Sequence, residues 1–264
     1  KYYSIYSDKF PIVYLEISLY AGEADTGNKG IEIPQLLGEV LKFGGSKNFP
    51  EDAFTGKLES LGASFSVSSD YDKIAINLSY LSRDEETVLG LVSDLLQNPN
   101  YSEVALSNGK KKMTESIQRR NERTETIGFR KAKELFYRGL LAGRISQVAS
   151  IEKIKMEDLK EFWESAKLKK KRISITGLFQ AKKIKETFSK IFSADTQNKP
   201  QDSKREVVTE AALAKSLDNY KYKNLLIAKD VNQSMVLMIG TLPRHNDPDF
   251  YAMQILDYII GGGG

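Results

Sequence analysis

Residues 30–45 of the chain read GIEIPQLLGEVLKFGG. Apolar side chains recur in this stretch at the i, i+3, i+4, i+7 spacing of a helix with one buried face, at Ile33, Leu36, Leu37, Val40 and Leu41. Gly44 and Gly45 come directly after this run and are typical of a helix end. The pattern predicts an amphipathic helix over residues 31–43.

The polar face of this helix carries Gln35, Gly38 and Glu39 on adjacent turns. Positions at i, i+3 and i+4 lie next to one another on a helix surface. The inverted zinc motif H-x-x-E-H uses this spacing for two metal-binding histidines and a catalytic glutamate. Here the same positions read Q-L-L-G-E, so the spacing is present without those residue types.

A zinc site with two histidines cannot form in this chain, which has no cysteine and one histidine, His245. Catalytic zinc is held by nitrogen, sulfur or carboxylate ligands, with histidine the commonest. Gly38 offers no carboxylate that could take a proton from a metal-bound water. We expect His245, in a polar loop, to lie on the surface.

Strands and helices are predicted along the rest of the chain from hydrophobic period and turn residues. We expect strands at 12–20 and 172–177, and a hairpin over 63–81 that turns near 70–72. Ser82–Glu85 has the spacing of a capping box. Further helices are predicted at 54–61, 85–97, 102–125, 129–141, 156–166 with Trp163 in the core, and 181–192.

Residues 193–206 are polar, lack an apolar period and contain Pro200, so they are the predicted linker. Beyond them, strands are expected at 225–228 and 234–242, followed by a helix from Asp247. Residues 235–262 then repeat the order of residues 15–45, a strand, a polar loop, a helix and a double glycine. Residues 207–264 are too few for a complete second unit, so we expect further sequence after Gly264.

Composition excludes several classes of function. With 264 residues, 41% of them hydrophobic, the chain can bury a large core, and its net charge is only +4. Its basic clusters lack interleaved aromatic residues, which favours solvated helix faces over a nucleic-acid surface. No apolar run is long enough to span a membrane. The absence of cysteine leaves the compartment open, whether exported or cytoplasmic.

Taken in order, several segments resemble the insulinase, pitrilysin and mitochondrial-processing-peptidase superfamily of zinc metallopeptidases. They are IYSDKFPIVYLEISLYAGEADTGNKGI, LESLGASFSVSSDYDKIAINLSYLSRD, LLQNPNYSE, IEKIKMEDLKEFW leading to RISITGLF, VNQSMVLMIG and DPDFYAMQILDYIIGGGG. The resemblance implies an α+β fold, in which a mixed, largely antiparallel sheet packs with helices. It further implies a first lobe over residues 1–192 and the incomplete start of a homologous lobe over 207–264.

The resemblance also assigns the altered motif. Gln35 falls at the first histidine, Gly38 at the catalytic glutamate, Glu39 at the second histidine and Glu115 at a third, distant zinc ligand. Only Glu115 keeps the family residue. We therefore expect no catalytic residue and no metal in this chain, with zinc in a partner subunit. An all-oxygen calcium or magnesium site at Gln35, Glu39 and Glu115 is the alternative to a plain polar patch.

Peptide contacts are implied at two places. In the family an edge strand pairs with an extended peptide through its main chain, and the matching residues are Ser64, Phe65, Ser66, Val67 and Ser68, with Ser66 in place of the usual asparagine. Gly261, Gly262, Gly263 and Gly264 are either a helix stop and hinge or a glycine-rich loop that touches substrate.

The resemblance predicts a non-catalytic subunit that binds peptides or unfolded segments and forms a heterodimer with a catalytic chain of the same family, or a homodimer. A scaffolding protein that keeps the fold without handling peptides is the alternative. An active peptidase with an unrecognised site is a third possibility.

Overall fold

The computed structural model describes residues 1–192, 208–218, 225–232, 234–241, 243 and 245–262. Its centre is a five-stranded sheet in the order β1-β5-β2-β4-β3. The neighbouring strands are antiparallel except β1 and β5, which are parallel. The strands are β1 (Tyr2–Tyr6), β2 (Ile12–Leu19), β3 (Ser64–Ser69), β4 (Ile74–Leu81) and β5 (Lys171–Gly177). The predicted α+β class and largely antiparallel sheet are confirmed.

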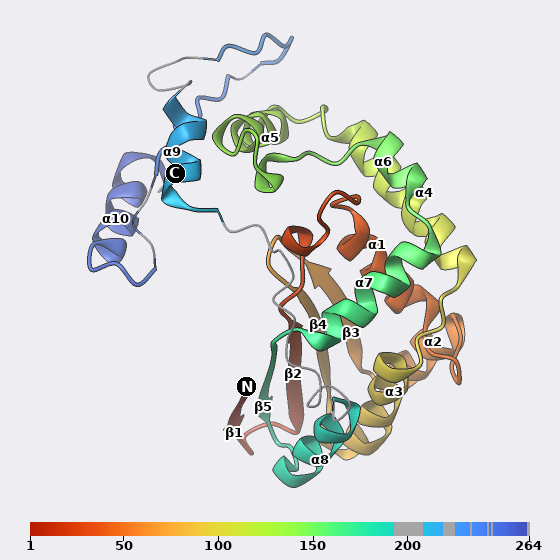
Figure 1. Cartoon of the computed structure of the whole chain (residues 1–264). Coiled ribbons are helices and arrows are strands. Elements are labelled where there is room, and N and C mark those ends of the chain that lie inside the picture. Colours follow the sequence, from red (N-terminus) through yellow and green to blue (C-terminus); the bar gives the residue numbers. More distant parts are fainter. Residues whose placement is uncertain (193–207, 219–224, 233, 242, 244, 263–264) are drawn as a thin grey trace.

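Helices pack beside this sheet, with α1, α3 and α7 on the same side of it (Figure 1). The α-helices are α1 (Ile33–Gly44), α2 (Asp52–Ser60), α3 (Glu85–Gln97), α4 (Glu103–Arg119), α5 (Thr124–Phe136), α6 (Val148–Lys153), α7 (Met156–Leu168), α8 (Ala181–Ile191), α9 (Glu210–Asp218) and α10 (Phe250–Asp257). Short 3-10 turns are η1 (Glu23–Asp25), η2 (Ser82–Asp84) and η3 (Leu141–Gly143), and η5 (Tyr258–Gly262) is a π-helical turn.

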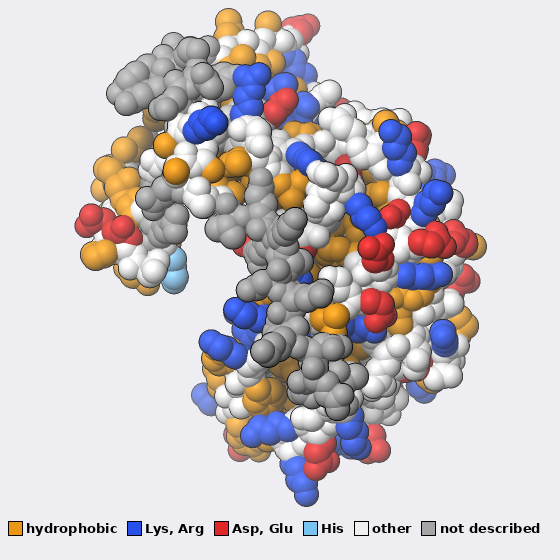
Figure 2. Space-filling model, in the orientation of Figure 1, with side chains coloured by type: hydrophobic (Ala, Val, Ile, Leu, Met, Phe, Trp, Pro, Cys, Tyr) orange, Lys and Arg blue, Asp and Glu red, His pale blue; other side chains and the backbone are white. Residues whose placement is uncertain are grey.

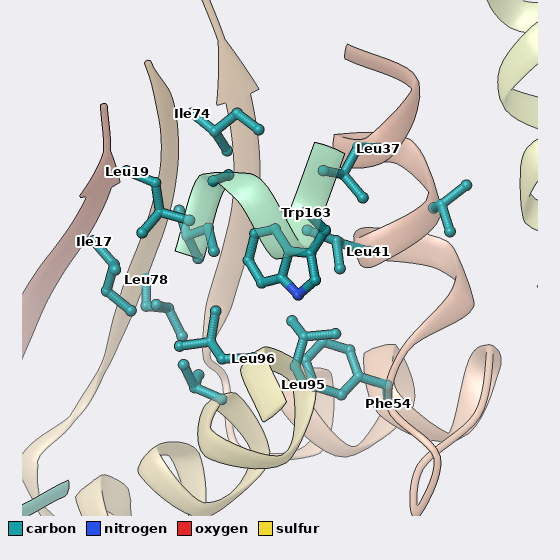
Figure 3. Packing of buried hydrophobic residues seen from close by; sticks show 14 of the residues in the cluster. Ile17, Leu19, Leu37, Leu41, Phe54, Ile74, Leu78, Leu95, Leu96 and Trp163 are labelled. Carbon is teal, nitrogen blue, oxygen red and sulfur yellow. The ribbon is translucent and has the colours of Figure 1, made fainter. Parts of the chain in front are cut away.

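The core lies between the sheet and these helices. Alternate residues of β2 point into it, and the whole apolar stripe predicted for α1 is buried. Trp163 of α7 is fully buried, as predicted, and packs among Leu37, Leu41, Leu95 and Phe54 (Figure 3). Helix α1 is therefore fixed in position by burial of its apolar face, which is the main favourable term in folding.

The ends of α1 are set by Pro34 in its first turn and by the two glycines after Phe43. A Cβ on Gly44 would lie 2.4 Å from the carbonyl oxygen of Asn100. Gly45 has a φ of 67°, a conformation that favours glycine. The Asn100 side chain donates to the Gly44 carbonyl at 2.9 Å. The double glycine thus ends the helix and lets the segment before α4 approach its C-terminus.

The predicted capping box at Ser82–Glu85 is wrong. Residues Ser82–Asp84 form the 3-10 turn η2, and no side chain caps the start of α3. The Glu85 carboxylate is instead buried and accepts the backbone N–H of Gln180 at 3.0 Å. Gln180 is the N-cap of α8, so this contact joins the starts of α3 and α8. A tertiary partner has replaced the local one that the spacing suggested.

The strands predicted after the linker are also wrong within the described residues. Residues 225–232 and 234–241 have no strand assignment, although a helix does follow as α10. A strand needs a neighbouring strand to pair with its main chain. This stretch instead lies beside α5 and the turn before it. Lys229 Nζ donates to the carbonyl of Asn121 at 2.6 Å, and Met235 and Leu237 lie close to Gly128.

Helix boundaries before this segment also shift. The predicted helix over 102–125 ends at Arg119, and the next helix begins at Thr124 rather than Phe129. The predicted linker, residues 193–206, lies outside the described residues. The division into a first lobe and the start of a second therefore stays a prediction.

Over α10 and η5, hydrophobic side chains are exposed (Figure 2), among them Tyr251, Ile255, Leu256, Tyr258, Ile259 and Ile260.

The burial of Glu85 predicts a dependence of stability on pH. Burial raises the pKa of Glu85, although the Gln180 N–H and Lys183 act in the opposite direction. The folded protein then binds a proton that the unfolded chain releases, so the free energy of unfolding falls as the pH rises above about 4.3, the unfolded pKa. Glu85→Gln keeps an acceptor for Gln180 without the charge. We expect this variant to match the parent near pH 4 and to melt at a higher temperature at pH 7.

The neighbouring Glu86 is the matched control. It lies on the exposed side of the helix and pairs with Lys183 at 2.7 Å, which lowers its pKa. Its contribution is present above the unfolded pKa and is lost as the pH falls, so Glu86→Gln should give the opposite trend. Equal pH profiles for the parent and Glu85→Gln in thermal melts would contradict the prediction.

Candidate functional site

Helix α1 packs against the edge strand β3 and against α4. Gln35 is exposed, Gly38 is buried and Glu39 is partly buried. The spacing predicted from the sequence is therefore present, with the three positions on adjacent turns of one helix. What the neighbouring elements place against each position decides its chemistry.

Gly38 is covered by the edge strand. A Cβ built on Gly38 would lie 3.2 Å from Val67 Cγ1 and 3.7 Å from the Val67 carbonyl oxygen. The former distance is tighter than an ordinary van der Waals contact, so the glycine allows α1 to lie close against β3. The position that the family resemblance assigns to a catalytic glutamate thus lies against a neighbouring side chain.

Glu39 is neutralised by a lysine. Its carboxylate lies 2.6 Å from Lys112 Nζ of α4, and its side chain is 16% exposed. Helix α4 reaches α1 through Gly109, where an added Cβ would lie 3.2 Å from Glu39 Cβ and 3.3 Å from Leu36 Cδ2. An ammonium at this position competes directly with any cation for the Glu39 oxygens.

Glu115 lies on α4 and is engaged by Arg119, with 3.7 Å between the guanidinium and the carboxylate. Within the described part of the chain, no group of three or more histidine or acidic residues is arranged to hold a metal ion. Gln35, Gly38, Glu39 and Glu115 therefore do not fit zinc. They also lack the converging free oxygens that a calcium or magnesium site needs.

A cavity of about 240 Å³ opens beside Gln35. It lies among α1, α4, η1, α5 and the loop after η3. The residues that line it are Glu23, Ile31, Gln35, Met113, Ser116, Ile117, Arg120, Lys133, Arg144, Ile145 and Ser146. Three of these are cationic and one is a carboxylate, so the lining of the space next to Gln35 has a net positive charge.

Two of the charged groups have shifted pKa values. Burial lowers the pKa of Arg120, and the charge of Arg130 lowers it further. Burial raises the pKa of Glu23, while Lys133, 3.8 Å away, opposes that shift. Glu23 and Arg120 are both partly buried, and electrostatic interactions are stronger in such a position than at an open surface.

Sequence reasoning missed this cavity. It placed the basic clusters on solvated helix faces, and Lys112 is exposed there while it pairs with Glu39, but Arg120 lines the cavity. The cationic residues come from α4, α5 and the loop after η3, and no spacing rule connects such distant positions. Only the packing of α4 and α5 around α1 brings them together.

The remaining predicted site residues are distributed as follows. Ser64, Ser66 and Ser68 are exposed on β3, with Phe65 and Val67 turned toward α2 and α1. His245 is exposed, as predicted. Gly261 and Gly262 lie in η5, and Gly263 and Gly264 lie outside the described residues.

With this geometry established, comparison with known proteins identifies the family. Residues 36–146, which include the motif positions and Glu115, match the sequence profile of the insulinase family, peptidase family M16. The chain carries an insulinase-family domain. A Helicobacter pylori (strain ATCC 700392 / 26695) protein named non-peptidase homolog YmxG is 25% identical to this chain over 153 residues.

Solved structures share the fold of the insulinase-family domain. An inactive M16 peptidase domain from Pseudomonas fluorescens gives a TM-score of 0.68 at 18% identity and covers 76% of this chain and 49% of its own. A Helicobacter pylori protease gives a TM-score of 0.62 at 15% identity, over 77% of this chain and 50% of its own. The YmxG alignment spans 57% of this chain and 35% of that protein.

The chain therefore spans about half or less of the relatives it matches. Among the described residues, no helix combines the length and the hydrophobicity that crossing a membrane requires. The names of two relatives, together with the residues at the motif positions, support a non-peptidase member of the family.

The contact between Gly38 and Val67 predicts that the family's glutamate is not tolerated here. Gly38→Glu should destabilise the protein by about 1–3 kcal/mol, because the longer side chain overpacks against β3. Denaturant unfolding measures this cost. Val67→Ala in the same chain should recover part of it as a favourable coupling energy in a double-mutant cycle.

Gly90 provides the matched control, since it lies in the middle of α3 and a Cβ there would meet no atom within 4 Å. Gly90→Glu should leave stability unchanged or raise it, because glutamate has a better helix propensity than glycine. Equal effects of the two substitutions would show that Val67 does not restrict Gly38.

Proposed function

We propose that this protein is a non-catalytic subunit that binds extended peptides along β3 and works beside a catalytic chain of the same family. The observation that carries the proposal is the position of β3. It is one of the two edge strands of the sheet, and it lies directly against helix α1.

The main chain of β3 is suited to pairing with another strand. Asp70 N–H donates to the Lys73 carbonyl at 2.9 Å, which makes this a hydrogen-bonded pair next to the β3–β4 register. Such pairs alternate along an antiparallel ladder. The outward main-chain groups therefore belong to Phe65, Val67 and Ser69, where an extended peptide could add to the sheet.

Catalysis is not supported by the same surface. The four motif positions offer one amide, one glycine and two carboxylates that are each engaged by a cation. Main-chain pairing does not depend on side-chain identity, so a peptide-binding edge can persist where the metal site is absent. This combination favours a binding role over hydrolysis by this chain.

A second chain would supply the missing chemistry. Two related chains that enclose a peptide between them would divide the work, with one positioning the peptide and the other holding zinc. The name of the YmxG relative, a non-peptidase homolog, supports a role other than hydrolysis for this chain as well. A complex with a catalytic subunit is proposed ahead of a homodimer, because a homodimer would contain no motif with histidine ligands.

Peptide binding can be tested at Ser69. Proline there removes one outward N–H while leaving the ladder to β4 in place, as an edge position allows. We expect Ser69→Pro to bind an unstructured peptide about fivefold more weakly, the equivalent of one net hydrogen bond of about 1 kcal/mol. Fluorescence anisotropy with the full chain measures the affinity.

Ser66→Ala is the control for this experiment. Its side chain lies on the exposed face of β3, so the substitution changes a side chain without touching the outward main chain. Affinity should stay at the parental value. If Ser66→Ala weakened binding as much as Ser69→Pro, recognition would depend on side chains, and main-chain pairing would be refuted.

The non-catalytic role makes a separate prediction. The purified chain with added zinc should not cleave an unstructured peptide, and chelator should change nothing. The same chain isolated from its native source should bring with it a second chain that contains an intact H-x-x-E-H, and this complex should cleave the peptide until chelator is added. Chelator-sensitive cleavage by the purified chain alone would overturn the proposal.

A further inference from the structure

The cavity beside Gln35 has features of a binding site for an anion. Its three cationic side chains come from separate elements, Arg120 from the end of α4, Lys133 from α5 and Arg144 from the loop after η3. Lys133 pairs with Glu23, and the two arginines are held by backbone carbonyls. Arg120 Nη1 donates to the Ser146 carbonyl at 2.6 Å, and Arg144 Nη1 donates to the Gly27 carbonyl at 3.1 Å.

These backbone contacts leave donors free. A guanidinium has five N–H donors, and only one nitrogen of each arginine is used by the contacts above. Among the residues that the structure describes, no carboxylate lies within ion-pair distance of Arg120 or Arg144. The amide of Gln35 and the hydroxyl of Ser116 add neutral donors to the same cavity. Oriented donors on fixed arginines match the geometry of a carboxylate.

Arg144 extends this surface beyond one cavity. It also lines a neighbouring cavity of about 430 Å³ with Arg138 and Glu134, and another of about 530 Å³ with Lys29 and Glu32. The acidic residues of these two cavities are engaged at least in part. Glu134 pairs with Lys131 at 2.9 Å and Asp158 with Lys29 at 3.4 Å. One carboxylate oxygen of Glu32 accepts the backbone N–H of Gln147 at 3.1 Å, and the other is buried without a hydrogen-bond partner. Arg144 therefore lies where a longer ligand could continue.

The cavity is also close to β3, the edge strand along which we propose that a peptide binds. Gln35 precedes Gly38 by one turn of α1, a rise of about 5 Å along the helix axis. Gly38 in turn contacts Val67 of β3, whose carbonyl oxygen faces the helix. A side chain or chain end of a peptide paired with β3 can span such a distance.

We propose that this cavity binds a carboxylate of the peptide that lies along β3, through Arg120 and Arg144 with Gln35. The inference rests on the proposed function for its source of ligand, and it adds a selectivity for acidic peptides. The positions that hold a metal ion in catalytic relatives would here border an anion site. The carboxylate belongs either to an aspartate or glutamate side chain or to a free C-terminus.

The test uses three peptides of the same length on the full chain, each with a neutral fluorophore. The first contains glutamates and an amidated C-terminus, the second has glutamine at those positions, and the third is the glutamine peptide with a free C-terminus. We expect the parent to bind a carboxylate-bearing peptide about tenfold more tightly than the amidated glutamine peptide. Tight binding of the first peptide or of the third identifies which carboxylate is recognised.

Arg120→Gln with Arg144→Gln should reduce this preference to about twofold or less, while the amidated glutamine peptide keeps its affinity. The control combines Lys57→Gln and Arg83→Gln, which remove the same charge from residues that do not line the cavity. This control should keep the full preference. Equal loss in both double variants would indicate a general effect of net charge and would overturn the inference.

A small carboxylate separates failure of the inference from failure of the proposed function. N-acetylglutamate methylamide, titrated into the parent, should shift the side-chain NMR signals of Arg120 and Arg144. If these signals shift while no peptide binds, the anion site stands and peptide binding along β3 fails. If peptides bind without preference and the signals do not move, the anion site is refuted and the proposed function stands.

Discussion

The close packing of helix α1 against its neighbours at two glycines sets the geometry of everything around its polar face. Gly38 admits Val67 of the edge strand, and Gly109 admits α1 against α4. The apolar stripe of α1 fixes the helix over the sheet, while these two contacts fix how near it lies to β3 and α4. The distances between the polar face of α1 and everything around it follow from this close packing, because protein interiors have few voids to absorb a displacement.

The same packing keeps the arrangement of elements seen in metallopeptidase-like folds and places other groups against the polar face of α1. The helix, the hairpin and the edge strand are in place, and the polar face of α1 contacts Val67 and Lys112. Arg120, at the end of α4, and Arg144, in the loop after η3, add positive charge beside Gln35. A cationic surface next to these positions disfavours a divalent ion and favours a carboxylate.

Predictions from the sequence succeeded where the signal was local and failed where a tertiary partner replaced it. The stripe of α1 and the alternation of β2 are repeated patterns, and both were confirmed. Glu85 sits at the right spacing for a capping box, but its carboxylate accepts from Gln180, far along the chain. Residues 225–241 have the composition of strands. In the described part of this stretch they lie beside α5 and pair with no strand.

The sequence by itself determined the fold class, the family resemblance and the exclusion of a zinc site with two histidines. Hydrophobic period and residue counts suffice for these, because they depend on which residues are present and how they alternate. Only the tertiary structure decided that Val67 fills the space at Gly38 and that Arg120 and Arg144 border Gln35. Those contacts join residues distant in the chain, and their positions depend on how the helices pack rather than on any local pattern.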